Sequence, residues 1–303
     1  MCIRDRPLPE KPERVIKWPE AEAIVLGAYR NFAPEMASIA KEFFDKNWID
    51  APVKPGKAPG AFSASTVPSV HPYVMMNYLG KPRDVMTLAH ELGHGVHQML
   101  AREQGPLLAP TPLTLAETAS VFGEMLTFKA LLAEAKDAKE KKAMLASKVE
   151  DMINTVVRQI AFYTFERKVH EARRNGELTA DQLNAFWLEV QTESLGPAID
   201  FKPGYEVYWT YIPHFIHSPF YVYAYAFGDC LVNSLDGLYA EAHPGFVGKY
   251  FDLLKAGGSK HHSEMLAPFG LDARDPAFWD KGLKVIEGMI DELEAMDRAA
   301  AVG

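Results

Sequence analysis

The stretch HELGHGVH, residues 90–97, holds three histidines and one glutamate within eight positions. On a helix, residues four apart lie on one face, about 6 Å apart along the axis. The imidazoles of His90 and His94 can therefore converge on one ion at about 2 Å, a ligand type and bond length that suit zinc. Glu91 can reach a water on that ion without binding the ion itself. The HExxH pattern thus predicts two metal ligands and a general base on one helix.

The alternative for this stretch is an exposed helix whose histidines are merely solvated. The apolar character of the neighbouring residues opposes it: Leu88, Ala89, Leu92 and Val96. Two glycines, Gly93 and Gly95, oppose it as well. Each costs about 1 kcal/mol in a helix interior, so their presence indicates that another segment packs very close to this helix.

A catalytic zinc needs a third protein ligand and an open coordination position. His97 lies seven residues beyond His90, about 10 Å along the axis, so one ion cannot bind both. The HExxHxxGxxH pattern is excluded because Leu100 stands where its third histidine would be. We interpret His97 as a packing residue or as a residue that orients a ligand.

Glu117 is a better candidate for the third ligand. It lies in LAETASVFGE, residues 115–124, within a helix predicted over about 112–135. Glu124 follows it seven residues later and so faces the same way. Small residues between them would let this helix approach the first: Ala116, Ala119, Ser120 and Gly123. An alternative remains open, because Thr114 and Glu117 also fit a capping box at the start of the helix.

Most of the remaining chain has helical periodicity. We predict helices over about 20–45 with a break near Pro34, over about 82–104, along an apolar stripe at 145–160, from the Thr179 capping box to Gly196, and around 283–293. Residues 61–78 predict two short strands with a turn near Pro68. The expected fold class is mainly α with one small β-sheet or hairpin near residues 60–78. Its edge could accept an extended peptide as an added strand, with Gly60, Ala61 and Phe62 at the opening.

The composition narrows the class of protein. Hydrophobic residues make up 48% of the 303 residues and charged residues 24%, as in globular proteins. The net charge is −8 and no basic run stands out, so we do not expect a nucleic-acid partner. The sequence contains no run of eighteen apolar residues, so we expect neither a membrane-spanning helix nor a membrane partner. With two cysteines and no signal-peptide pattern, the expected location is the cytoplasm.

Five segments together carry a family resemblance. HELGHGVH and LAETASVFGE resemble the active-site core of the oligoendopeptidase F branch of the thimet-oligopeptidase-like zinc metallopeptidases. Three further segments agree with it: residues 60–78, IPHFIHSPFYVYAYAFG at 212–228 and LLKAGGSKHHSEMLAPFG at 253–270. The resemblance implies a helical zincin-type catalytic domain and an oligopeptide substrate. It also implies that His90, His94 and Glu117 bind one Zn²⁺, that Glu91 is the base and that Glu124 orients a ligand histidine.

The aromatic run at 212–228 is where this family supplies a hydrogen-bond donor to the oxyanion. Tyr221 and Tyr225 are four apart, so on a helix starting near Pro219 their hydroxyls would face the same side. His214 and His217 lie just before them, and the sequence leaves open which histidine takes part in catalysis. The alternative for the tyrosines is ordinary core packing.

The N-terminus begins abruptly with MCIRDR, followed by a Pro/Lys/Glu stretch without periodicity. We interpret residues 1–17 as an irregular segment at a truncated start and residues 18–303 as the catalytic domain. Members of the resembled family also carry a long helical N-terminal half, which this sequence lacks.

The expected function is zinc-dependent endopeptidase action on short peptides. One alternative is an exopeptidase, for which no charged terminus-binding subsite is evident in the sequence. Another is an inactive peptide-binding fragment. Peptide preference and oligomeric state are not predicted.

Overall fold

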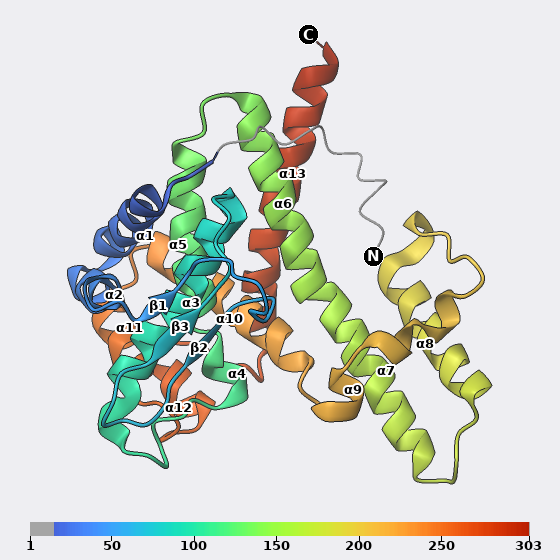
Figure 1. Ribbon diagram of the computed structural model, residues 1–303. Coiled ribbons are helices and arrows are strands. Elements are labelled where there is room, and N and C mark those ends of the chain that lie inside the picture. The colour runs from blue at the N-terminus through green and yellow to red at the C-terminus, as the bar shows by residue number, and fades with distance from the viewer. Residues whose placement is uncertain (1–14, 303) are drawn as a thin grey trace.

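The computed structural model describes residues 15–302. The chain is mainly helical with one small sheet, which confirms the predicted fold class (Figure 1). The expected irregular segment 1–17 falls mostly outside the described residues. Of its last three residues, Ile16 is buried and its backbone N–H donates to the Gly80 carbonyl oxygen.

Most of the helices are joined by short connections, but residues 46–81 separate α2 from α3 and residues 196–213 separate α8 from α9. The α-helices are α1 Trp18–Phe32, α2 Pro34–Asp45, α3 Pro82–Ala101, α4 Leu113–Ala116, α5 Ser120–Ala133, α6 Ala138–Thr155, α7 Val157–Arg173, α8 Ala180–Leu195, α9 His214–His217, α10 Tyr223–Ala240, α11 Phe246–Lys255, α12 His262–Leu266 and α13 Pro276–Val302. The predicted break at Pro34 and the Thr179–Gln182 capping box are both confirmed.

The sheet has three strands in the order β1-β3-β2. The predicted hairpin is confirmed as β2, Phe62–Ala64, antiparallel to β3, Tyr73–Met75. A third strand, β1 at Ile49–Asp50, pairs parallel with β3 and was not predicted, because two residues are too few to show alternation. The order leaves β2 at one edge of the sheet, beside α3.

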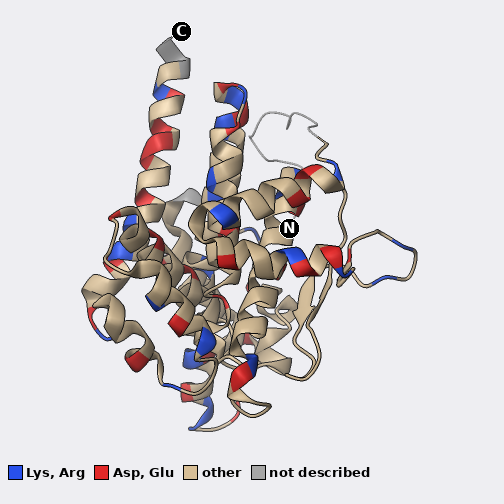
Figure 2. Cartoon of the chain, turned by 90° about the vertical axis from the view of Figure 1, so that its left-hand side faces the viewer, with Lys and Arg blue, Asp and Glu red and all other residues tan. Residues whose placement is uncertain are grey.

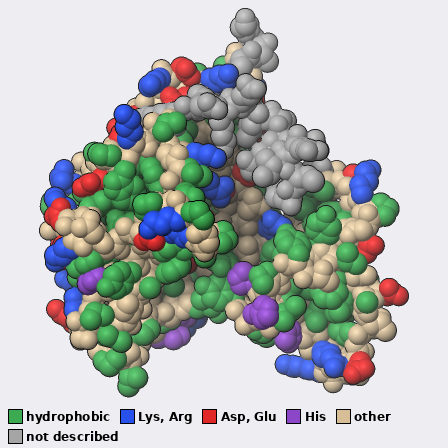
Figure 3. Space-filling model, in the orientation of Figure 1, with side chains coloured by type: hydrophobic (Ala, Val, Ile, Leu, Met, Phe, Trp, Pro, Cys, Tyr) green, Lys and Arg blue, Asp and Glu red, His purple; other side chains and the backbone are tan. Residues whose placement is uncertain are grey.

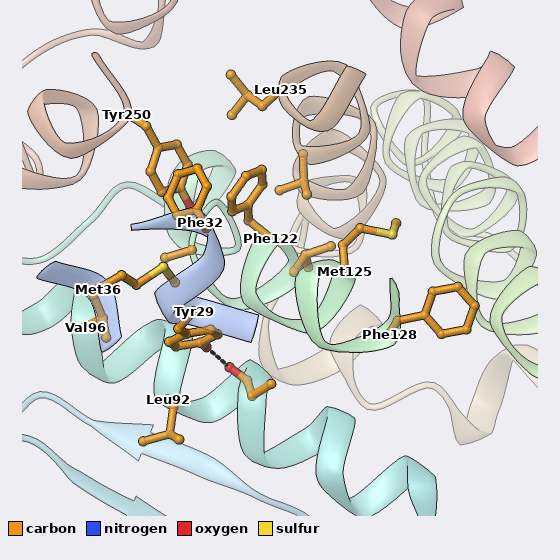
Figure 4. Close-up of a cluster of buried hydrophobic side chains, with 14 of the residues drawn as sticks. Tyr29, Phe32, Met36, Leu92, Val96, Phe122, Met125, Phe128, Leu235 and Tyr250 are labelled. Carbon is orange, nitrogen blue, oxygen red and sulfur yellow. Dashed lines mark hydrogen bonds between the residues drawn. The ribbon is translucent and has the colours of Figure 1, made fainter. Parts of the chain in front are cut away.

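Helix α3 lies in the main hydrophobic core, against α1, α2, α5 and α11. The hydroxyl of Tyr29, which is labelled in Figure 4, donates a hydrogen bond to the carbonyl oxygen of Ala89, and Ala89 directly precedes His90. A Cβ atom on Gly93 would lie 2.3 Å from the Ala119 carbonyl oxygen, and one on Gly95 would lie 2.6 Å from the Phe43 ring. The predicted close packing at both glycines is therefore confirmed.

A second, smaller hydrophobic cluster joins α7 and α8 to the segment before α10. Its buried residues are Phe162, Phe165, Trp187, Val190, Ile212 and Val222. In Figure 1 these helices form a separate lobe beside the sheet-containing body. Figure 3 shows the surface hollowed between the two.

Three helix predictions were wrong in detail. The helix expected over 112–135 is interrupted between α4 and α5, at residues 117–119. The stripe expected over 145–160 divides at Val156, after which Val157 and Ile160 are exposed. The helix expected to start near Pro219 starts at Tyr223, because the chain first turns through Phe220, whose φ is 59°.

Two surface properties bear on possible partners. Acidic and basic residues are interspersed on the face in Figure 2, without a continuous basic stripe among the residues drawn in colour. Within the described residues, we find no helix with the length and apolar character required to cross a lipid bilayer.

Candidate active site

His90, His94 and Glu117 offer three ligand atoms that all lie within 4.8 Å of one another. Glu117 Oε2 lies 3.3 Å from His90 Nε2 and 3.4 Å from His94 Nε2. Bonds of about 2 Å at tetrahedral angles place neighbouring donor atoms about 3.3 Å apart. Two imidazole nitrogens and one carboxylate oxygen at these separations fit a zinc ion.

Glu117 reaches the histidines from the turn between α4 and α5. It is the C-cap residue of α4, and Thr114 forms no capping box with it, so the alternative of a helix-start residue is wrong. A Cβ atom on Gly228 of α10 would lie 2.8 Å from Glu117 Cβ. Gly228 therefore gives the Glu117 side chain the room to lie between α3 and α10.

Two further contacts hold these side chains in place. The Ser120 hydroxyl donates to Glu117 Oε2 at 2.7 Å. Glu124 Oε2 lies 3.2 Å from His90 Nδ1, which leaves His90 Nε2 facing Glu117. Glu124 Oε1 accepts a 2.8 Å hydrogen bond from Lys148 Nζ on α6, and Lys148 is only 3% exposed. A histidine ligand whose second nitrogen contacts a carboxylate is a common arrangement at metal sites.

The electrostatics of the cluster favour a positive charge between the carboxylates. Burial lowers the pKa of His90, but Glu117 and Glu124 at its two ring nitrogens outweigh this and raise the pKa above its usual value. Burial raises the carboxyl pKa values, yet His90 lowers that of Glu117, and Lys148 with His90 lowers that of Glu124. Burial lowers the pKa of His94 to about 4, so its imidazole is neutral near pH 7.

Glu91 lies beside the three ligand candidates and is not one of the cluster. It lines a cavity of about 360 Å³ together with His90 and Glu117. Burial raises the pKa of its carboxyl to about 7, against the opposing effect of His90 and with a smaller contribution from Glu117. A carboxylate with a pKa near neutrality is suited to accept a proton and then release it.

The aromatic run contributes one residue to the same cavity. Tyr225 lines it, and its hydroxyl lies 3.4 Å from His214 Nε2. Tyr221 sits in the turn before α10, yet its ring centroid is 5.2 Å from that of Tyr225. His217 is exposed at the end of α9. The structure thus brings His214, and not His217, next to the tyrosine that faces the ligand candidates.

Of the three residues expected at the sheet edge, only Ala61 lines the larger cavity. Gly60 has φ +90°, a backbone conformation that favours glycine, and nothing lies within 4 Å of a Cβ position there. Phe62 is 51% exposed. The neighbouring Ser63 carbonyl oxygen of β2 already accepts from Gln98 of α3 at 3.3 Å, a bond that an added peptide strand would replace.

Sequence reasoning missed Ser120, Lys148 and Gly228 as parts of this site. A signal existed for Lys148, since it occupies a helical position three residues after Leu145 on an otherwise apolar stripe. No such signal existed for Gly228, whose role depends on how α10 packs. His97 is buried, its pKa lowered to about 3 by burial, and its Nε2 lies 3.3 Å from the Thr111 hydroxyl. It is not among the candidate metal ligands, and it lines a second, smaller cavity next to His94.

Comparison with known proteins agrees with this geometry. The sequence pattern of Peptidase family M3 matches residues 30–285. The chain is 33% identical over 267 residues to the plasmid oligoendopeptidase F of Lactococcus lactis subsp. cremoris, covering 88% of this chain and 44% of that protein. It is 31% identical over 294 residues to oligopeptidase PepF of Bacillus subtilis, covering 96% and 43%. The chain spans less than half the length of these curated relatives.

Solved structures show the same fold. A crystal structure of a putative peptidase from Chlamydophila abortus matches with a TM-score of 0.83 and 30% identity, covering 95% of this chain and 49% of that one. That of oligoendopeptidase-F from Enterococcus faecium matches with a TM-score of 0.67 and 24% identity, covering 95% and 45%. Since the family pattern extends over most of the chain, from α1 to α13, this chain belongs to peptidase family M3.

Proposed function

We propose that this chain is the catalytic part of a zinc-dependent oligopeptidase that cleaves internal bonds of short peptides. The observation that carries the proposal is the separation of 3.3 and 3.4 Å between Glu117 Oε2 and the two histidine nitrogens. Membership of a peptidase family and the names of the related oligoendopeptidases support the substrate class.

In this proposal His90, His94 and Glu117 hold the zinc ion. A bound zinc ion would lower the pKa of a water molecule and polarise the peptide carbonyl. The Glu91 carboxylate takes one proton from the attacking water and passes it to the nitrogen of the leaving amine. The Tyr225 hydroxyl donates to the carbonyl oxygen as negative charge develops there. Lys148 keeps Glu124 in contact with His90, which fixes the imidazole orientation.

We also propose residues 18–303 as the catalytic domain and the cytoplasm as its location. The family pattern over residues 30–285 supports the first proposal. The presence of only two cysteines supports the second.

The test combines metal analysis with cleavage of an internally quenched peptide blocked at both ends. We expect one zinc per chain, cleavage at an internal bond, loss of cleavage with a chelator and recovery on adding zinc. Cleavage only of peptides with a free terminus would contradict the endopeptidase mode. Bound zinc without any cleavage would contradict catalysis and favour a peptide-binding fragment.

A further inference from the structure

Two cavities flank the candidate metal centre. The larger one contains His90 and Glu117, as described above. A smaller one of about 250 Å³ begins at His94 and Ala116 and extends along α3 to Arg102. Because both cavities adjoin the candidate ligands, a peptide with its cleaved bond at the metal would extend into both.

The two cavities differ in charge. Five carboxylates line the larger one, namely Glu91, Glu117, Glu124, Asp151 and Asp229, with Arg83 and Lys148 as the basic residues. The described residues that line the smaller one include no carboxylate, and Arg102 is the only permanently charged residue among them. The smaller cavity is therefore suited to an anionic group and the larger one is not.

Arg102 has no acidic partner among residues 15–302. Its one polar contact there is weak, with Nη1 3.8 Å from Met99 Sδ. Several other arginines pair with a carboxylate, for example Arg274 with Asp272 at 2.8 Å. A half-buried guanidinium without a carboxylate keeps several N–H donors available for a ligand.

The edge strand β2 connects the two cavities. Ala61, just before β2, lines the larger cavity, and Ser65 and Thr66, just after it, line the smaller one. Arg102 follows His94 by eight residues, about 12 Å along the helix axis. An extended peptide advances about 3.3 Å per residue, so this distance corresponds to about three or four peptide residues.

We propose that Arg102 is a subsite for a carboxylate of the peptide substrate, about three or four residues from the cleaved bond. The guanidinium can bind a carboxylate through two parallel N–H···O hydrogen bonds. The carboxylate can belong to an Asp or Glu side chain or to the peptide C-terminus. This inference rests on the proposed function, because it takes the candidate metal centre as the place of cleavage.

The experiment uses blocked, internally quenched peptides in which a single Glu replaces Gln at each position in turn. One further peptide has no Glu and a free C-terminal carboxylate, and mass spectrometry locates each cleaved bond. For the zinc-loaded chain we expect kcat/KM to rise about five- to tenfold when the carboxylate stands three or four residues from that bond. The position that responds also distinguishes a side chain from a C-terminus.

The matched variants separate Arg102 from general effects on charge. Arg102→Gln should remove the preference, and Arg102→Lys should retain part of it because the charge remains. Arg274→Gln, a change of the same chemistry at an exposed position outside both cavities, should leave the preference intact. A preference that survives in Arg102→Gln, or that is absent from the parent chain, overturns the inference.

A binding measurement keeps the test independent of turnover. In the Glu91→Gln background, the affinity for the preferred peptide and for its Gln counterpart is measured with and without Arg102→Gln. We expect a preference for the Glu peptide that disappears with Arg102 and weakens as salt is added. Equal affinities, or no binding of either peptide, overturn the subsite. If the parent chain cleaves nothing while the Arg102-dependent binding is present, the proposed catalysis fails and the subsite stands.

Discussion

The orientation of the His90 imidazole depends on a series of side-chain contacts that reaches from α3 to α6. His90 contacts Glu124, and Glu124 contacts Lys148, whose ammonium group is almost completely buried. Buried charges are tolerated only when they are paired. The position of the imidazole therefore depends on a lysine on a different helix.

This series predicts the effect of Lys148→Met on stability. The substitution leaves the Glu124 carboxylate, whose side chain is 20% exposed, without its cation and should lower the free energy of unfolding by about 3 kcal/mol. Urea unfolding measures the change. Lys168→Met is the control, because Lys168 pairs with a Glu189 side chain that is 56% exposed and its loss should cost about 0–1 kcal/mol. Equal losses of unfolding free energy in the two variants would show that the Lys148–Glu124 pair contributes no more to stability than the exposed Lys168–Glu189 pair.

Tyr225 and Tyr221 differ in their relation to the ligand candidates. Tyr225 lines the larger cavity, whereas Tyr221 lies in the turn before α10. We expect Tyr225→Phe to lower kcat by roughly 10²–10³ with little change in KM, the size of effect seen for one oxyanion donor. Tyr221→Phe should retain most of kcat. The measurement is steady-state kinetics of both variants, and an unchanged kcat for Tyr225→Phe would remove its hydroxyl from the mechanism.

Among the elements, the packing of α3 against α5 and the turn before it sets the distance between the histidines and the two glutamates. The backbone of Ala119 and Ser120 lies so close to Gly93 that any side chain there would collide. Glycine is thus required for the helix contact, although it lowers the helical propensity of α3.

Gly93→Ala should therefore destabilise the protein and disturb the metal site. We expect a loss of about 1–3 kcal/mol, because the two helices must separate, together with weaker zinc binding. Thermal unfolding and zinc titration measure the two effects. Gly288→Ala is the matched control in α13, since nothing lies within 4 Å of a Cβ position there, and it should stabilise the chain by about 0.5–1 kcal/mol. If Gly93→Ala and Gly288→Ala changed the stability and the zinc affinity equally, the close contact at Gly93 would not contribute to either.

The sequence predicts local features of these elements well. The spacing of His90 and His94 and the cap at Thr179 have local causes, and both are found in the structure. The glycines at 93 and 95 predicted close packing, which is confirmed, but not which segments pack there. The turn that presents Glu117 could not be predicted, because it depends on packing against Gly228, more than a hundred residues later. For the same reason β1 was missed, since its pairing with β3 involves few residues far apart in sequence.

The whole molecule brings the candidate site together from both hydrophobic clusters. His90, His94 and Glu117 belong to elements of the main core, whereas His214 lies between Ile212 and Val222 of the smaller cluster. The contact between Tyr225 and His214 spans this junction. The position of Tyr225 at the cavity therefore depends on how the lobe that contains α7 and α8 packs against the main core.

Zinc should stabilise the folded chain as a whole. A ligand that binds only the folded state at about 100 times its Kd contributes about 2.7 kcal/mol, so a chelator should lower Tm by several degrees. Glu117→Ala removes one ligand candidate, and its Tm should respond little to zinc or chelator. Differential scanning calorimetry measures both proteins. A zinc-dependent Tm that is the same in the variant and the parent would place the metal elsewhere.

The most direct test of the central claim is the turnover of Glu91→Gln loaded with zinc, measured on the blocked quenched peptide beside the parent chain. An amide cannot accept the proton of the attacking water, while His90, His94 and Glu117 are unchanged. We predict one zinc per chain in both proteins, cleavage by the parent and cleavage lower by several orders of magnitude in the variant. Zinc-loaded Glu91→Gln that cleaves the peptide at the parent rate would contradict the account.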